Sequence, residues 1–443
     1  MKPDGRGVRG ALVCAGNAAE VAVAALLLGI PVGLIAWLFL YLMNALMTVV
    51  WKTLPSALGI DLSSSKSLLP FWFIFAVTVV GALALALCER VAKVRVQTIM
   101  PVLAQVKKTG RYEYRGRRTW RYFASALLPL VFGSAVGPEA GLANSLAAMC
   151  TWAGDKMKSL ATCCAACAGE GRIAGFADVR RALIGLGCRP YSFVRPQKVV
   201  LYSIAIAGGV ASYGLASSIA GGGLSLPRLP EIAWTPEGLA RQFAWALPCA
   251  AAGIVLGVVY CVCDKACAWL GERLDRWPVR RNLLVALALS LLGSCIPYVM
   301  FSGEGDLDAV VANWRALGVG ALLGMVLGRC ILTPLCIRCG WKGGQFFPLI
   351  FMGVAAGYAV ALAVGVDPVL CASFSSAAML GAVMRKPVVA AATMLLVMPL
   401  ETVPFLLVAA ALGSVVPLPA SWGVPPAKRF GAKRGKNGTS PAD

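Results

Sequence analysis

The sequence has no histidine and little charge. Of its 443 residues, 20 are Asp or Glu and 41 are Lys or Arg, so that only 14% are charged, against about 25% in a soluble domain. Without histidine the chain cannot form imidazole metal sites, His general bases, or Ser-His and Cys-His pairs. These absences exclude a water-soluble globule and most enzyme chemistry. We therefore predict no catalytic residues, no cofactor and no enzymatic activity.

Hydrophobic residues make up 59% of the chain. A helix that crosses the hydrocarbon core needs about 20 residues without strong charge. Seven stretches without Asp, Glu, Lys or Arg are long enough: residues 21–51, 67–88, 199–227, 242–263, 282–303, 343–366 and 402–427. The fold class predicted is an all-α polytopic membrane protein.

Shorter apolar segments, rich in Gly, Ala and Pro, lie between the long ones in both halves of the chain. They are residues 122–138, 140–154, 316–328, 368–384 and 387–400. Broken apolar segments in both halves are typical of discontinuous, re-entrant helices that meet at a site in the middle of the membrane. The pattern therefore indicates a permeation pathway.

Basic residues give the chain a formal charge of +21, and they gather in residues 107–121 and in the tail. Because positive loops stay on the cytoplasmic side, we place both termini in the cytoplasm and the protein in the inner (plasma) membrane. No signal peptide is evident. The bases sit between apolar runs, which indicates contact with the lipid surface and no nucleic-acid partner.

Sixteen cysteines are present, with groupings at Cys163, Cys164 and Cys167 and a C-x-x-C at Cys336 and Cys339. A closed zinc site needs a second such pair or histidines, and most of the cysteines lie in apolar runs. We therefore expect packing and no metal site. A membrane protein without transport activity, whose cysteines bind metal or sense redox state, is the alternative from another class.

The first segment that packing does not explain is residues 133–141, Gly-Ser-Ala-Val-Gly-Pro-Glu-Ala-Gly. It places the isolated acid Glu139 between two apolar runs, and such an acid is by default a functional hypothesis. The N–H groups of Glu139, Ala140 and Gly141 would be free donors at the start of the next helix. In the alternative interpretation, Glu139 only caps its helix or faces an Arg. The turn itself is built by Gly133, Ser134, Gly137 and Pro138.

The second segment is a glycine-rich turn at Gly343 and Gly344, which opens another apolar run. The residues Gln345, Phe346 and Phe347 offer successive N–H groups at the next helix start, and Pro348 follows. Two helix N-termini, one from each half, would enclose an anion with partial positive charges. Partial charges allow an ion to enter and leave, as conduction requires.

The first segment resembles the gating-glutamate motif of the chloride channel (CLC) family of anion channels and proton-coupled exchangers, and residues 344–348 resemble that family's G-x-F-x-P. Arg329 and residues 385–387 also fall where the family has comparable residues. The resemblance implies a homodimer whose subunits each contain two inverted-topology halves and their own pore. It also implies that Glu139 is the gate, that the N–H groups of Gln345 and Phe346 form the central site, and that chloride is the ion.

Three departures from the family pattern bear on the function. Residues 97–101 keep only the proline of the family's G-S-G-I-P, with Thr98 as the remaining hydroxyl donor to the anion. No tyrosine follows Tyr358, although the family has one in its last helices. Residues 191–194, Tyr-Ser-Phe-Val, include no acid where exchangers have an inner one.

We therefore predict a passive anion channel that opens when Glu139 is protonated or displaced by the anion. The alternative is a proton-coupled chloride exchanger that uses another acid, such as Glu170 or Asp178. The predicted organisation is a cytoplasmic segment 1–19, a first transmembrane half 20–197, a second half 198–423, and a disordered basic cytoplasmic tail 424–443.

Overall fold

The computed structural model describes residues 5–60, 69–92, 99–112, 114, 116–184, 193–223, 228–232, 239–417 and 419. Most of this part is α-helical, and extended pairing within it is limited to one isolated bridge. The main helices are α1 (Gly5–Thr48), α3 (Phe71–Ala92), α4 (Ile99–Thr109), α5 (Gly116–Val131), α6 (Glu139–Gly169), α7 (Phe176–Ile184), α8 (Arg195–Ala220), α9 (Leu239–Leu274), α10 (Pro278–Cys295), α11 (Leu307–Arg338), α12 (Phe346–Val364), α13 (Pro368–Met384), α14 (Pro387–Met394) and α15 (Val403–Val415). Short pieces are η1 (Val49–Thr53), α2 (Leu54–Ala57) and η3 (Leu400–Thr402). The all-α prediction is confirmed.

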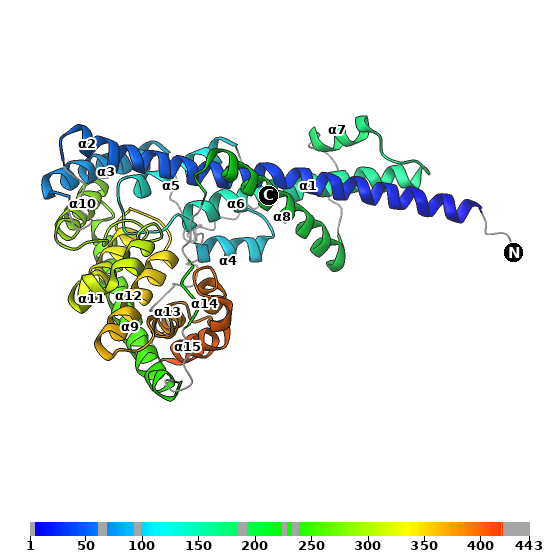
Figure 1. Ribbon diagram of the computed structural model, residues 1–443. Coiled ribbons are helices and arrows are strands. Elements are labelled where there is room, and N and C mark those ends of the chain that lie inside the picture. Colours follow the sequence, from blue (N-terminus) through cyan, green and yellow to red (C-terminus); the bar gives the residue numbers. More distant parts are fainter. Residues whose placement is uncertain are drawn as a thin grey trace, which may run out of the picture.

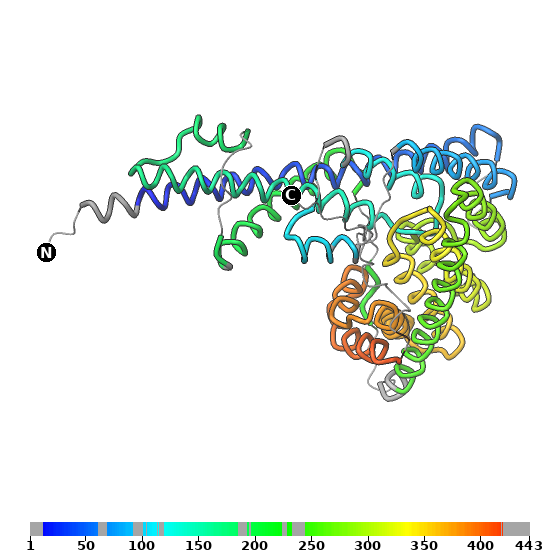
Figure 2. Tube along the Cα trace, turned by 180° about the vertical axis from the view of Figure 1, so that it is seen from behind, coloured from blue at the N-terminus to red at the C-terminus, as the bar shows by residue number. Residues whose placement is uncertain are grey.

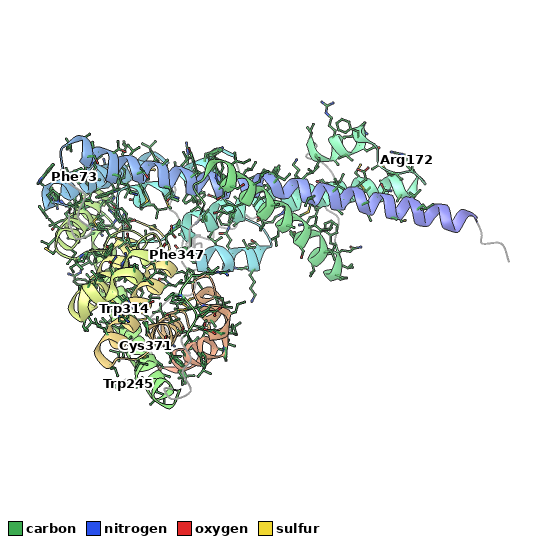
Figure 3. The ribbon with its side chains drawn as sticks, in the orientation of Figure 1. Phe73, Arg172, Trp245, Trp314, Phe347 and Cys371 are labelled. Atoms are coloured by element: carbon green, nitrogen blue, oxygen red, sulfur yellow. The ribbon has the colours of Figure 1, made fainter. Side chains whose placement is uncertain are left out.

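The helices form two connected bodies (Figure 1). The long α1 runs beside α6 and α8, and these helices extend well to one side of the second body, with α7 near their outer end, as the reverse view also shows (Figure 2). In the second body, α12 and α13 pack against each other among α9, α11 and α15. Both central helices are almost wholly buried. The start of α12 lies where the two bodies meet, as the position of Phe347 shows (Figure 3).

The starts of several helices follow from local sequence. Proline stands at one of the first two positions of α8, α10, α13, α14 and α15, where its missing N–H costs no hydrogen bond. At α13, the Asp367 carboxylate accepts hydrogen bonds from the N–H groups of Val369 and Leu370, both at 2.9 Å. These signals fix where these helices begin.

Six helical stretches are long and apolar enough to cross a membrane: Leu12–Ala57, Phe71–Val91, Pro196–Ala220, Ala244–Leu274, Leu307–Arg338 and Phe346–Val364. Five of them coincide with predicted stretches. The chain is thus a multi-pass membrane protein.

Two predictions about the helices need correction, and a third falls partly outside the described residues. The stretch 282–303 contributes only α10, whose 18 residues include Arg280 and Arg281 near its start. The described part of residues 402–427 contributes the 13-residue α15, and residues 418 and 420–427 lie outside the described residues. Residues 316–328, judged too short, belong to the long span of α11, which continues through a kink at Gly318.

The domain boundaries stay predictions. The segment 1–19 is helical from Gly5 and continues directly into the first span as α1, and the tail lies outside the described residues.

A buried arginine holds the turn between α10 and α11. Arg329, fully buried in α11, donates to the carbonyl oxygens of Tyr298 at 2.7 and 3.0 Å, Met300 at 2.8 Å and Phe301 at 2.9 Å. It also stacks on the Phe351 ring at 4.1 Å. Tyr298 and Phe301 have left-handed φ angles of 53° and 61°, which side chains disfavour. The four hydrogen bonds maintain this strained turn.

We predict that Arg329→Met lowers the stability of the protein by roughly 3 kcal/mol, because three carbonyl groups lose their donor at about 1 kcal/mol each. The measurement is thermal unfolding of the detergent-solubilised protein. Arg315→Met is the matched control, because Arg315 is exposed on the same helix. Equal unfolding temperatures for the two variants would contradict the role of Arg329.

Candidate functional site

The two glycine-rich turns predicted separately lie against each other. The Gly137 N–H donates to the Gly344 carbonyl at 2.8 Å, and the Gly344 N–H donates to the Gly137 carbonyl at 2.7 Å. The pair forms an antiparallel bridge between the start of α6 and the start of α12. The bridge therefore places the turn of the first half directly against the turn of the second half.

The Glu139 side chain crosses this junction. Glu139 is the first residue of α6, yet its Oε1 accepts a hydrogen bond of 2.8 Å from the Phe347 N–H, in the first turn of α12. The N–H groups of Phe346 and of Glu139 itself also interact with the carboxylate. Among the described residues, no Arg or Lys forms an ion pair with it. Glu139 therefore does more than cap its own helix. Within the described part of the chain, no basic side chain pairs with its carboxylate.

Both glycines of the bridge leave room for this carboxylate. A Cβ atom on Gly137 or on Gly344 would overlap Glu139 Oε2. Any side chain at either position would push the carboxylate away from α12. The space is thus shaped by the absence of two side chains.

A second acid, which the sequence analysis missed, lies near the first. Glu304 stands in the turn before α11 and is close enough to Glu139 for electrostatic interaction. Within the described part of the chain, Oε2 of Glu304 and Oε2 of Glu139 are enclosed and have no hydrogen-bond partner. A partial signal was present, because Glu304 lies between Gly303 and Gly305 at the end of an apolar run. Unlike Glu139 it is not isolated, since Asp306 and Asp308 follow it.

Neighbouring helices fix the turns around the two acids. The Thr333 hydroxyl in α11 donates to the Ala135 carbonyl at 2.8 Å, and the Trp51 indole donates to the Val131 carbonyl at 2.8 Å. Arg329 anchors the turn that leads to Glu304. The Tyr260 hydroxyl donates to the Gln345 side chain at 3.3 Å. These contacts preorganise the junction.

The residues predicted as donors in the second turn stand at the start of α12. Gln345 is the N-cap of α12, and Phe346, Phe347 and Pro348 are its first three residues. Gly343 packs tightly on the Val136 side chain. Together they place the start of α12 against the carboxylate.

The residues predicted in the first segment, 133–141, differ in their surroundings. Gly133, Ser134 and Pro138 are buried in it, and the Ser134 hydroxyl has no partner within the described residues. Ala140 and Gly141 are buried in the first turn of α6, but Gly141 faces Phe39 and Ala126. Thr98 lies outside the described residues.

The acids considered for a proton route lie elsewhere. Glu170 and Asp178 each form an ion pair with Arg172, at 2.8 and 2.6 Å. Arg172 lies far from Phe347, near α7 (Figure 3). The Arg172 guanidinium also lowers the pKa of Asp178.

The residues before Arg195 are apolar. Phe193 is buried in an apolar cluster and Val194 is exposed, while Tyr191 and Ser192 lie outside the described residues. No described acid stands at this point.

Chemically, the start of α12 is a site for one negatively charged atom. The N–H groups of its first turn have no intrahelical partner, and the helix dipole adds a partial positive charge there. In the structure, Glu139 Oε1 lies at this position. A small anion would compete with the carboxylate for the same donor.

Comparison with known proteins agrees with this architecture. The family model for the voltage gated chloride channel matches residues 194–417, just over half of the chain. A search of curated protein sequences finds no significant match.

Solved structures resemble nearly the whole chain. A slow cyanobacterial Cl−/H+ antiporter has a TM-score of 0.63 and 18% identity over 89% of this chain and 94% of its own. A CLC-type fluoride/proton antiporter has a TM-score of 0.59 and 16% identity over 90% and 95%. A eukaryotic CLC transporter has a TM-score of 0.57 and 15% identity over 90% and 71%. At such identities the likeness concerns the fold.

The family match contains the Gly344–Phe347 turn and α12, and the similar structures extend the likeness to the half that carries Glu139. The two motifs, which the sequence analysis attributed to one family, form one site. On this evidence the chain belongs to the voltage gated chloride channel (CLC) family.

Proposed function

We propose that this chain conducts a small anion, chloride, and that Glu139 is the gate. The observation that carries the proposal is the hydrogen bond from the Phe347 N–H to Glu139 Oε1. It places a carboxylate where an anion would bind at the start of α12. In this position the charged side chain blocks the pathway, and the pathway opens when the side chain moves away.

The mechanism is competition for backbone donors. Ionised Glu139 occupies the donors of Phe346 and Phe347. Protonation weakens its hold because the neutral acid loses the attraction to the positive end of α12. A high anion concentration displaces it by mass action. Partial charges bind the anion weakly enough to release it.

Proton-coupled exchange is a second candidate, and Glu304 is the observation that favours it. A carboxyl group beside the gate offers a second place for a proton, and acids inside membranes often form proton relays. The similar structures described as Cl−/H+ and fluoride/proton antiporters make this candidate worth a direct test. Against it stand the apolar residues Phe193 and Val194 and the remote positions of Glu170 and Asp178.

We further propose that the protein works as a homodimer in the inner (plasma) membrane with both termini in the cytoplasm. The support is the family membership and the basic segment 107–121.

The first prediction concerns the gate. Glu139→Gln should raise the anion efflux from liposomes and flatten its dependence on external pH, because an amide cannot ionise and no longer competes for the α12 donors. Efflux is measured with chloride and fluoride electrodes from pH 4 to 8. Equal rates for the two proteins over that range would mean that Glu139 is not the gate.

The second prediction separates backbone from side chain. Phe347→Pro deletes the N–H that Glu139 now occupies, whereas Phe347→Leu keeps it. We expect the proline variant to lose conduction by about tenfold or more, given a charge-assisted hydrogen bond worth about 1.5–3 kcal/mol, and the leucine variant to conduct nearly normally. Both are compared by electrode-monitored efflux after an elution check for intact protein. Equal losses of conduction in the two variants would mean that the Phe347 side chain, and not its N–H, holds the anion.

The third prediction distinguishes passive conduction from exchange. Liposomes receive a chloride gradient, no pH gradient, and a voltage fixed by potassium and valinomycin, and internal pH is followed with a dye. Passive conduction predicts no sustained proton movement. If the wild type moves protons uphill and Glu304→Gln abolishes that movement, the protein is an exchanger and not a passive channel.

A further inference from the structure

The outer end of α6 brings three metal-binding side chains together. Within the described part of the chain, Cys163 Sγ, Cys167 Sγ and a carboxylate oxygen of Asp178 all lie within 4.8 Å of one another. The sequence analysis expected these cysteines only to pack, because the chain has neither a second C-x-x-C pair nor a histidine to complete a metal site, and it did not consider Asp178 as a ligand. We propose that Cys163, Cys167 and Asp178 bind one divalent cation of the zinc class.

Local structure explains the juxtaposition. Residues four apart lie on the same face of a helix, so α6 presents Cys163 and Cys167 side by side. The chain then reverses, and Asp178 stands in the first turn of α7. Cys163 Sγ lies 3.7 Å from the main-chain oxygen of Asp178. This turn therefore brings the Asp178 carboxylate close to the two thiols.

Helix α1 clamps this turn. Asn17 is buried, and its side chain makes two hydrogen bonds with the turn. Its Nδ2 donates to the Arg172 carbonyl at 3.2 Å, and its Oδ1 accepts from the Ala174 N–H at 2.9 Å. The ligand group is thus held before any ion binds, which reduces the ordering cost of binding.

Donors around Asp178 orient its carboxylate. Arg172 donates to Asp178 Oδ2 at 2.6 Å, and the Gly175 N–H donates to the same oxygen at 3.1 Å. Such outer-shell donors commonly orient metal-binding carboxylates. Two thiolates and one carboxylate carry three negative charges, which a divalent cation and Arg172 neutralise together.

The donor set selects the ion. Two sulfur atoms and one oxygen suit zinc or cadmium, whereas magnesium and calcium prefer oxygen alone. Tetrahedral zinc would keep one position for water. Cys167 is buried and the other two ligands are half-buried, so an ion can enter from outside. The position beside Arg172, remote from Phe347 (Figure 3), gives the ion a structural role in joining α6 to α7.

The test uses the full-length protein, reduced and freed of metal by a chelator. Cobalt and cadmium are added as probes, and the thiolate-to-metal absorption is recorded. Zinc content after zinc loading and desalting is measured by mass spectrometry. We expect the wild type to bind one ion more than Cys163→Ser/Cys167→Ser. Asp178→Asn should weaken binding by at least about tenfold, as the loss of even an outer-shell partner does.

Cys150→Ser is the matched control, because Cys150 is an exposed thiol of the same helix, and it should bind as the wild type does. Circular dichroism verifies that each variant keeps its helices. If the double variant does not fold, the cobalt spectrum of the wild type and the affinity of Asp178→Asn still decide. Equal metal content in all variants, no thiolate absorption, or a Cys163–Cys167 disulfide in protein that binds no metal would overturn the proposal.

Discussion

Two hydrogen bonds between Gly137 and Gly344 are the constraint on which the site depends. They join a turn of the first half to a turn of the second, and so fix the start of α6 against the start of α12. At that separation, Glu139 reaches across to the Phe347 N–H. A side chain on either glycine would close the space that the carboxylate occupies. Thr333, Trp51 and Arg329 support the bridge indirectly, because each bonds to the backbone of a turn that surrounds it.

The electrostatics of the site follow from the scarcity of charge in the sequence. Two acids, Glu139 and Glu304, lie near each other. The Arg329 guanidinium donates its hydrogen bonds to main-chain carbonyls. The carboxylate of Glu139 is therefore stabilised by helix starts. Among the described residues, no basic side chain contributes to this. Under the proposed function, a site built in this way releases the anion readily, because partial charges attract less strongly than a full one.

Local sequence predicted much of this arrangement. Glu139, Gly137, Gly344 and the donors at the start of α12 were identified because an isolated acid and glycine-rich turns are visible in the chain itself. Five of the predicted stretches coincide with spans for the same reason, since length and hydropathy are local properties. The meeting of the two turns was expected from the symmetry of the motifs and from the family resemblance.

What the sequence did not predict depends on tertiary structure. Glu304 was overlooked because nothing local connects it to Glu139, although its glycine neighbours were a usable signal. The span of α11 was underestimated because Arg315 and Arg329 interrupt its apolar run, yet Arg329 is satisfied by carbonyl groups of another segment. Asp178 could not be placed beside Cys163, because the turn between them is held by Asn17 from α1.

The central claim is that Glu139 and the transported anion compete for the N–H groups at the start of α12. The most direct measurement is the anomalous scattering of bromide in crystals of the wild type and of Glu139→Gln, grown at neutral pH with the same bromide concentration. The account predicts a bromide peak within hydrogen-bonding distance of the Phe347 N–H in the variant and none there in the wild type. A bromide ion at that N–H in the wild type, with the Glu139 carboxylate still bound to it, would contradict the account.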